Sequence, residues 1–269
     1  MRSAVLPLVT FGLFAMVIAD RLSDVLAAHS PAPVPVAAEL EGTVLGVASP
    51  SAPARTENRN AAGAALTATP TIDRLARLAI RQQISREAGR TYLDSLMLTT
   101  DSVVRRWPDR SGVPFKVCLV EGGPSDYQPR MAQFVQEALS SWENTGMGVR
   151  FDLVADTSAA EIVVRWIDRF EFDRAGQTDL TWDQAGRIRK ATISLALRTS
   201  TGFPLPDGAL LSVAAHEAGH ALGLPHSADS NDVMYPATRT GTLSERDRRT
   251  AQVLYQLQPG PVRDPIDMP

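Results

Sequence analysis

The chain has 269 residues, of which 44% are hydrophobic and 21% are charged, and its formal net charge is −3. This length accommodates one or two domains, and the composition is typical of an ordinary soluble protein. The slight acidic excess argues against a nucleic-acid-binding protein, which would normally carry a basic surface. A single cysteine, Cys118, excludes an intrachain disulfide, so the fold must rest on packing and on any bound metal.

The first residues form a basic and then apolar segment that is typical of an export signal. Arg2 precedes an apolar run over residues 4–19, and the Val-Ile-Ala sequence at 17–19 suits a signal-peptidase site. The run is shorter than the roughly 20 residues that span a bilayer. Residues 1–28 are interpreted as a signal peptide or an uncleaved N-terminal anchor. The rest of the chain is therefore expected to be exported, and to be secreted, periplasmic or membrane-anchored by this segment alone.

Two further segments precede the main domain. Residues 29–70 are rich in Ala, Pro, Ser and Gly and predict a disordered linker, because they offer too little apolar surface to offset their ordering entropy. Residues 71–112 begin with a helical pattern, with Thr71 as N-cap and an apolar spacing formed by Ile72, Leu75, Leu78 and Ala79. This segment predicts one or two helices, which either pack on the main domain or act as a latency segment.

Residues 113–258 are expected to form the main domain. An alternating stretch at 114–121 predicts a strand in which Cys118 is a buried thiol. A long amphipathic helix follows within 125–146, with an apolar stripe of Met131, Phe134, Val135, Ala138, Leu139 and Trp142. Strands are predicted within 148–156 and 160–170. The order strand, helix, strand predicts a βαβ unit and a parallel sheet.

The second half of this domain alternates short elements with polar connections. After a polar loop, residues 191–197 predict a strand, and a second helix is expected from residue 207 or 208 to about 222. A third helix is expected within 242–257, where Ser244 and Asp247 have the spacing of a capping box. The Pro-rich residues 259–269 predict a flexible tail.

Three of the four histidines lie within eleven residues. His216 and His220 are four residues apart on the second predicted helix, so both rings lie on one face and suit a shared zinc ion. Gly223 ends the helix and turns the chain back, which brings His226 to the same ion. Three imidazoles leave the fourth tetrahedral position to water, as in a catalytic zinc site, and the sequence offers no obvious fourth protein ligand.

Glu217 follows the first of these histidines. A carboxylate there can lie beside the metal without binding it, within reach of a water whose pKa zinc lowers from about 15.7 to roughly 7. Glu217 is therefore the candidate general base. The clustered histidines and the adjacent glutamate predict hydrolysis that depends on zinc.

The pattern HExxHxxGxxH followed by a methionine resembles the metzincin metallopeptidases. Ser227 after the third histidine, and the spacing from there to Met234, resemble the matrixin branch. The resemblance implies a zinc-dependent endopeptidase that acts on polypeptides with one catalytic zinc, and a Met-turn at 233–236 beneath the metal. It also implies that substrate lies extended along an edge strand, for which residues 191–197 are the candidate.

The resemblance further implies an α/β (α+β) metzincin-like fold. Such a fold has a mostly parallel twisted sheet with an antiparallel edge strand, two long helices and the zinc site on the second of them. A short C-terminal subdomain then carries a third helix.

The sequence departs from typical matrixins in three places. It has no histidines to spare for a second zinc ion, and calcium-binding loops are not evident between Asp168 and Asp183, which leaves a calcium requirement open. Ser111 stands where a propeptide cysteine switch would place its thiol. The alternative function is a non-catalytic zinc-binding adhesion or scaffold domain with a relic site, which a missing glutamate or a fourth protein ligand would indicate. Peptide preference and oligomeric state are not specified.

Overall fold

The structure is a computed structural model that describes residues 72–98, 102–110 and 112–263. The expected signal segment 1–28 and linker 29–70 lie outside these ranges. Among the described residues, none of the helices combines the length and apolar character that crossing a membrane requires.

A five-stranded sheet forms the centre of the fold, with the strand order β3-β2-β4-β6-β5. Its first four strands in this order are parallel, and β5 is antiparallel to β6. The mostly parallel sheet with an antiparallel edge strand is therefore confirmed, and so is the βαβ unit at its start. The strands are β2 (Phe115–Leu119), β3 (Phe151–Leu153), β4 (Ile162–Ile167), β5 (Gly176–Trp182) and β6 (Ile188–Ala196).

The edge strand is not the one that the sequence indicated. Residues 191–197 lie almost entirely in β6, which is paired on both sides, with β4 and with β5. The antiparallel edge strand is β5, which comes from the stretch predicted to be a polar loop. Its buried positions are Gly176 and Thr178, so no alternation of apolar and polar side chains marks it as a strand.

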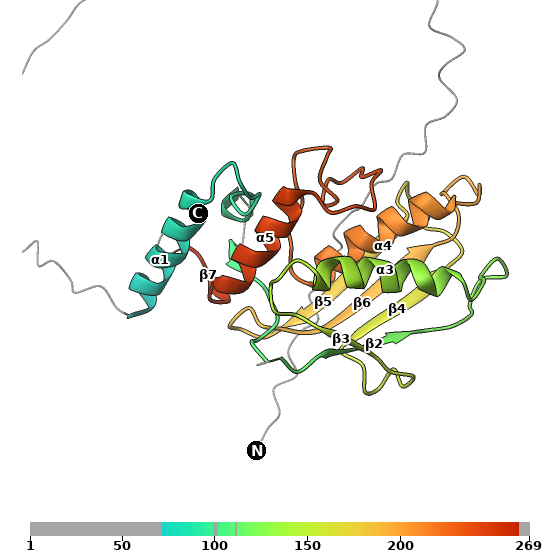
Figure 1. Cartoon of the computed structure of the whole chain (residues 1–269), viewed down its shortest axis with the longest axis horizontal. Coiled ribbons are helices and arrows are strands. Elements are labelled where there is room, and N and C mark those ends of the chain that lie inside the picture. The colour runs from blue at the N-terminus through green and yellow to red at the C-terminus, as the bar shows by residue number, and fades with distance from the viewer. Residues whose placement is uncertain (1–71, 99–101, 111, 264–269) are drawn as a thin grey trace, which may run out of the picture. The chain divides into compact units, whose positions relative to one another are not determined.

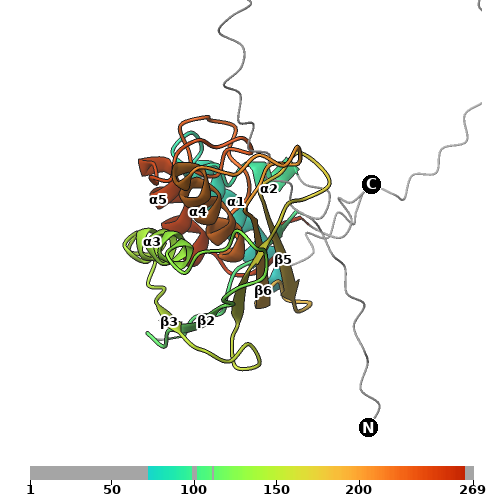
Figure 2. The ribbon, with the colours of Figure 1, turned by 90° about the vertical axis from the view of Figure 1, so that its right-hand side faces the viewer.

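Two helices lie side by side on one face of the sheet, α3 (Met131–Glu143) and α4 (Asp207–Ala221) (Figures 1 and 2). The predicted stripe of α3 is buried, apart from a half-buried Phe134. Trp142 of that stripe donates its indole N–H to the Ala215 carbonyl at 2.8 Å. This bond links α3 to the middle of α4, where the predicted metal ligands begin.

The chain continues into α5 (Glu245–Gln256), whose predicted capping box is present between Ser244 and Asp247. The tail after it is not flexible at its start, as residues 259–269 were expected to be. Gly260–Pro261 form β7, which pairs with β1 (Val103–Val104), and the buried Val262 donates its N–H to the Ser102 carbonyl at 2.8 Å. Backbone pairing with a distant segment holds these residues, and composition alone does not reveal such pairing.

The segment before the main domain contains α1 (Ile72–Arg86) and α2 (Ser95–Leu98), and α1 lies beside α5 in Figure 1. The helix α1 is confirmed, but the face that packs is Ile80 and Ile84, while Ile72, Leu75 and Leu78 are exposed. Both faces carry apolar residues, so periodicity could not select between them. At its C-terminal end, Glu87 pairs with Arg249 of α5, with a 3.0 Å contact from Nε to Oε2.

Residues 102–110 pack directly on the main domain. Trp107 is 1% exposed and donates its indole N–H to the Ala221 carbonyl, at the end of α4, at 2.8 Å. The buried Arg106 donates Nε to the Leu257 carbonyl at 2.7 Å and also pairs with Asp109. These contacts show that residues 102–110 pack on the main domain.

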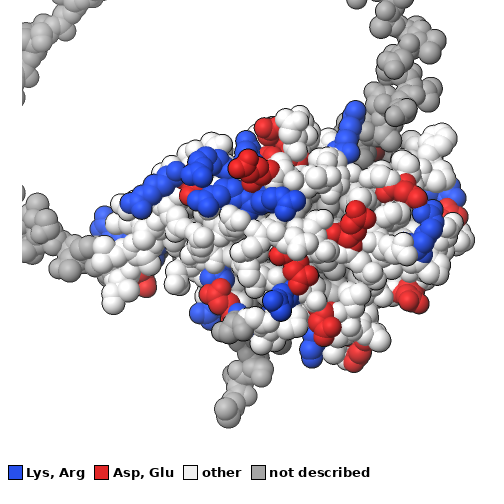
Figure 3. All heavy atoms as spheres, viewed as in Figure 1, with Lys and Arg blue, Asp and Glu red and all other residues white. Residues whose placement is uncertain are grey.

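Basic side chains gather over α1 and the start of α5 on the face drawn in Figure 3. There Arg90, Arg246 and Arg249 line a surface hollow of about 440 Å³ with Asp232, Ser244 and Glu245. The hollow is separate from the predicted metal ligands, since none of the three histidines lines it. These arginines form ion pairs with Glu87, Asp229 and Asp232. The ion pairs connect the chain around residues 87–90 with α5 and with the loop that contains Asp229 and Asp232.

Candidate metal centre

His216 and His220 lie one turn apart on α4 and are almost fully buried. Their rings are oriented by backbone carbonyls, because His216 Nδ1 lies 2.7 Å from the Val233 oxygen and His220 Nδ1 lies 2.9 Å from the Leu224 oxygen. A carbonyl can only accept, so each Nδ1 carries the proton and each Nε2 keeps its lone pair. A hydrogen bond from the other ring nitrogen fixes the tautomer and the orientation of an imidazole that binds a metal.

The third histidine arrives through a tight turn at the end of α4. Gly223 N–H bonds to the His220 carbonyl at 2.9 Å and Leu224 N–H bonds to the Gly219 carbonyl at 3.1 Å, which is a Schellman motif. Gly223 has a φ of 97°, and a Cβ there would lie 2.2 Å from the Arg105 carbonyl oxygen. Both the turn and the close approach of the preceding segment therefore require glycine at this position.

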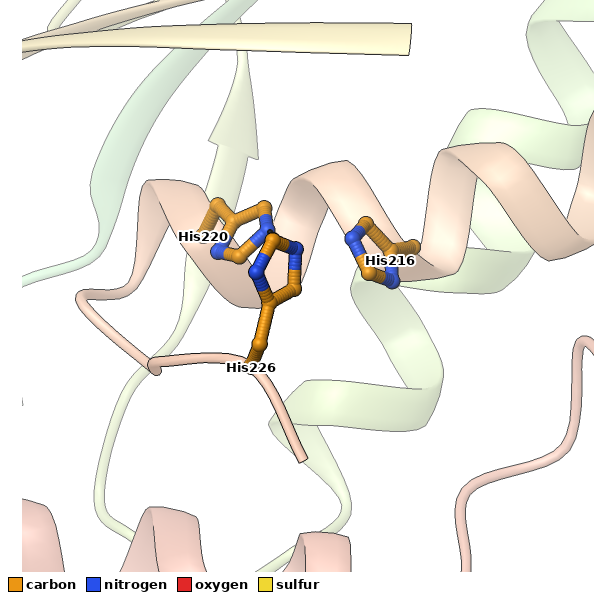
Figure 4. Close-up of side chains that lie close together, drawn as sticks. All are labelled: His216, His220 and His226. Carbon is orange, nitrogen blue, oxygen red and sulfur yellow. Dashed lines mark hydrogen bonds between the residues drawn. The ribbon is translucent and has the colours of Figure 1, made fainter. Parts of the chain in front are cut away.

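The three rings converge on one point, as Figure 4 shows for His216 and His220 from the helix and His226 from the loop. One nitrogen of each ring lies within 4.8 Å of the others, and the Nε2 atoms of His220 and His226 are 3.1 Å apart. His216 Nε2 is buried and has no hydrogen-bond partner among the described residues. An orphaned buried lone pair facing two others fits a tetrahedral zinc ion with an open fourth position.

Burial keeps these imidazoles neutral. Desolvation lowers the pKa of His216 to about 3 and that of His226 to about 4, and it lowers the pKa of His220 well below its usual value. The neighbouring rings lower the values for His216 and His220 further. Neutral imidazole is the form that binds zinc, so the fold presents the ligands ready to bind.

Glu217 is fully buried against the edge strand β5. Its Oε2 accepts a hydrogen bond from the Thr178 hydroxyl at 2.6 Å, while Oε1 is buried without a partner among the described residues. Desolvation raises the pKa of Glu217 to about 8, and the bond from Thr178 opposes that rise. A carboxyl with a raised pKa and one free oxygen has the character of a general acid or base.

Met234 packs against α4, the helix that carries His216 and His220. It is fully buried, and a Cβ added to Gly219 would lie 2.3 Å from the Met234 sulfur and 2.9 Å from the Trp142 ring. Gly219 therefore allows the predicted Met-turn to approach α4 next to His220. The Met234 carbonyl also accepts the Ser227 N–H at 2.8 Å, which ties the turn to the loop that carries His226.

Buried carboxylates accept hydrogen bonds from the Met-turn segment and its neighbours. The sequence pattern does not identify these carboxylates as site residues. Asp247 Oδ2 accepts the Val233 N–H at 2.8 Å, and Asp247 Oδ1 accepts the Tyr92 hydroxyl at 2.9 Å. Asp232 accepts the Ser244 hydroxyl at 2.6 Å and also the Ser227 hydroxyl. The capping-box spacing signalled Asp247, but nothing in the sequence signalled that it also serves the Met-turn.

The sequence of this chain matches a known protein family. The family model described as matrixin, of the M10 peptidases, matches residues 116–256, which is more than half of the chain. The chain belongs to the matrixin family. The matched region contains all three histidines, Glu217 and Met234.

Individual relatives match over short stretches of this matrixin. Matrilysin from Felis catus is 44% identical over 54 residues, which is 20% of this chain and 17% of the relative. Metalloendoproteinase 1 from Glycine max is 34% identical over 85 residues, or 30% and 24%. The 72 kDa type IV collagenase from Gallus gallus is 44% identical over 62 residues, or 22% and 9%. The chain thus aligns with less than a quarter of the length of each of these relatives.

Proposed function

We propose that this matrixin is an exported zinc-dependent endopeptidase, in which His216, His220 and His226 hold one zinc ion and Glu217 is the general base. One observation carries the proposal: three imidazole nitrogens converge within 4.8 Å, and the residue after the first of them is a buried carboxylate with a free oxygen. Four protein ligands would indicate a structural ion, whereas only three histidines converge among the described residues.

When bound, zinc would polarise the scissile carbonyl and make water acidic enough to be deprotonated near neutral pH. The protein's own contribution is then a proton transfer. Glu217 Oε1 accepts a proton from the attacking water, and the resulting carboxylic acid passes that proton to the leaving amine. The carboxylate is regenerated in the same turnover, so the residue serves first as base and then as acid.

The substrate is proposed to be an extended polypeptide that adds to the outer edge of β5. This strand ends the sheet, so its outer backbone groups are not used by another described strand. An extended chain can bind such an edge through main-chain hydrogen bonds, as in other cases of strand addition. The buried Thr178 side chain of β5 contacts Glu217, and Gly176 of the same strand approaches it closely, so this edge lies next to the proposed base.

Zinc content and peptide cleavage together test the proposal. The full chain should bind one zinc ion and cleave casein or a quenched peptide, and a chelator should abolish cleavage. Glu217→Gln should retain zinc and lose roughly 10²- to 10⁴-fold in kcat, because the amide cannot accept the proton. Glu137→Gln, which removes an exposed carboxylate on α3, is the matched control.

The alternative, a zinc-binding scaffold, makes the opposite prediction. Zinc-loaded wild-type protein that cleaves no peptide in a broad library would support it. His226→Ala should lower zinc content under either function, because two ligands leave the ion under-coordinated. Loss of zinc therefore tests the ligand assignment, and loss of cleavage with zinc retained tests the mechanism.

Export is a separate part of the proposal and rests on Arg2 and the apolar run at 4–19. A mature N-terminus near Asp20 would indicate cleavage, and full-length protein in the membrane fraction would indicate an anchor. Intact protein found solely in the cytosol would refute both.

A further inference from the structure

Thr178 on the edge strand makes a direct contact with the proposed base. Its side chain is fully buried, and its hydroxyl lies 2.6 Å from Glu217 Oε2 and 3.0 Å from the Glu217 main-chain carbonyl oxygen. A hydroxyl has a single proton to donate, and the shorter contact is to the carboxyl group. The bond therefore fixes one carboxyl oxygen of Glu217.

The same strand also shapes the space that the carboxyl group occupies. Gly176 precedes Thr178 by two residues, so both positions face the same side of β5. A Cβ on Gly176 would lie 2.4 Å from Glu217 Oε1 and 2.6 Å from its Cγ, closer than real Cβ atoms approach other atoms. The edge strand thus contacts both oxygens of the carboxyl group, through the close approach of Gly176 to Oε1 and the hydrogen bond from Thr178 to Oε2.

We infer that Thr178 is a positioning residue for catalysis, which acts by holding Glu217 Oε2 so that Oε1 remains available to the attacking water. The inference rests on the proposed function, since it requires Glu217 to be the base. Rotation about the last side-chain bond of a glutamate is soft, so an unheld carboxylate samples orientations from which neither oxygen reaches the water. A buried hydrogen bond to the carboxyl group removes that freedom.

Two substitutions separate the hydroxyl from the volume of the side chain. Thr178→Val keeps the shape of the side chain and removes the hydrogen bond, whereas Thr178→Ser keeps the hydroxyl. A hydrogen bond to a charged group is strong enough that its loss should lower kcat roughly 10- to 100-fold. KM and zinc content should change little in Thr178→Val, because the substituted side chain holds neither peptide nor metal. Thr178→Ser should recover most of the kcat.

The experiment uses the full chain, with kcat and KM on a quenched peptide, zinc per chain and the unfolding midpoint measured for each variant. Thr192→Val on the neighbouring strand β6 controls for the loss of a threonine hydroxyl from the sheet. If Thr178→Val is unstable, Thr178→Ala provides the second variant lacking the hydroxyl. Normal kcat in a folded, zinc-loaded variant without the hydroxyl would overturn the inference. An equal loss in Thr178→Ser would also overturn it.

Glu217→Gln, measured in the same series, distinguishes a failure of the proposed function from a failure of the inference about Thr178. If Glu217→Gln is inactive while Thr178→Val cleaves normally, the proposed function stands and the role of Thr178 is refuted. If Glu217→Gln itself cleaves normally, the proposed base is wrong, and the inference about Thr178 falls with it.

Discussion

The Tyr92 hydroxyl donates a 2.9 Å hydrogen bond to Asp247 Oδ1, across 155 residues of sequence. The other oxygen of Asp247 accepts the Val233 N–H at 2.8 Å, directly before Met234. One carboxyl group thus connects the segment that precedes the matrixin domain to the turn beneath the metal centre. The candidate metal centre is thus braced by Tyr92, which lies outside the matched family region, 116–256.

Tyr92→Phe tests this brace. The substitution keeps the buried ring and leaves Oδ1 of a buried carboxyl group with the long 3.5 Å contact from the Met234 N–H alone, which should lower the free energy of unfolding by about 1.5 to 3 kcal/mol. Urea denaturation of the zinc-loaded protein measures the loss. Tyr127→Phe, at a partly exposed tyrosine, should change stability by less than about 0.5 kcal/mol. Equal stabilities for the two variants would contradict a bracing role for the Tyr92 hydroxyl.

The boundary of the folding unit gives a second prediction. A fragment starting at Val113, the domain boundary expected from sequence, lacks Trp107 and Arg106, which bond to α4 and to the residue after α5. It also lacks the buried Tyr92 and Leu93. Residues 113–269 should therefore melt at a lower temperature and be digested faster by an added protease than residues 72–269. Matching melting temperatures would show that the preceding segment is dispensable.

Gly219→Ala should damage the metal centre through packing. The new methyl group would lie 2.3 Å from the Met234 sulfur, and the Met-turn would have to shift beside His220. Overpacking of this kind costs about 1 to 3 kcal/mol, and zinc affinity should fall with it. Gly208→Ala in the same helix is the control, because nothing lies within 4 Å of its added Cβ. Its stability should stay the same or rise by up to about 1 kcal/mol, so equal effects at both glycines would refute the argument.

In the metal-free protein, the buried histidines should lower the stability as the pH falls from about 6.5 toward 4, whereas the raised pKa of Glu217 acts in the opposite direction. The folded pKa values of His226, about 4, and His216, about 3, lie below the usual histidine value of about 6.5 because burial disfavours the charged ring. The unfolded chain therefore binds protons first, so this contribution to stability is complete above pH 6.5 and is lost on acidification. Urea denaturation in the presence of a chelator, at a series of pH values, measures the slope. His226→Asn should flatten it, and an unchanged slope would contradict the assignment.

The sequence was sufficient to predict those structural features that depend on residues close together in the chain. The stripe on α3, the capping box of Ser244 and Asp247, and the ends of α4 all depend on spacings within a few turns, and the structure has them. The convergence of His226 with the two helical histidines was likewise predictable, because one glycine turn sets it. Local hydrogen bonding and side-chain periodicity encode these features directly.

Sequence was insufficient where a contact joins distant segments. Strand β5 packs one face on α4 through Gly176 and Thr178, so it lacks the apolar alternation that marks an ordinary edge strand. The contact between Thr178 and Glu217 spans 39 residues. For α1, two apolar faces were available, and tertiary packing decides that Ile80 and Ile84 are the buried residues. Such choices depend on tertiary packing, which a residue pattern does not record.

The pairing of β1 with β7 also sets an order of events during biosynthesis. Val103 and Val104 are synthesised long before their partners Pro261 and Gly260. Tyr92 is likewise synthesised long before its hydrogen-bond partner Asp247. Contacts of such large sequence separation form slowly, because the intervening chain must first be closed into a loop. The brace behind the Met-turn is therefore completed only after Asp247 in α5 has been synthesised. A nascent chain that has already made all three histidines still lacks the support that fixes the turn beneath them.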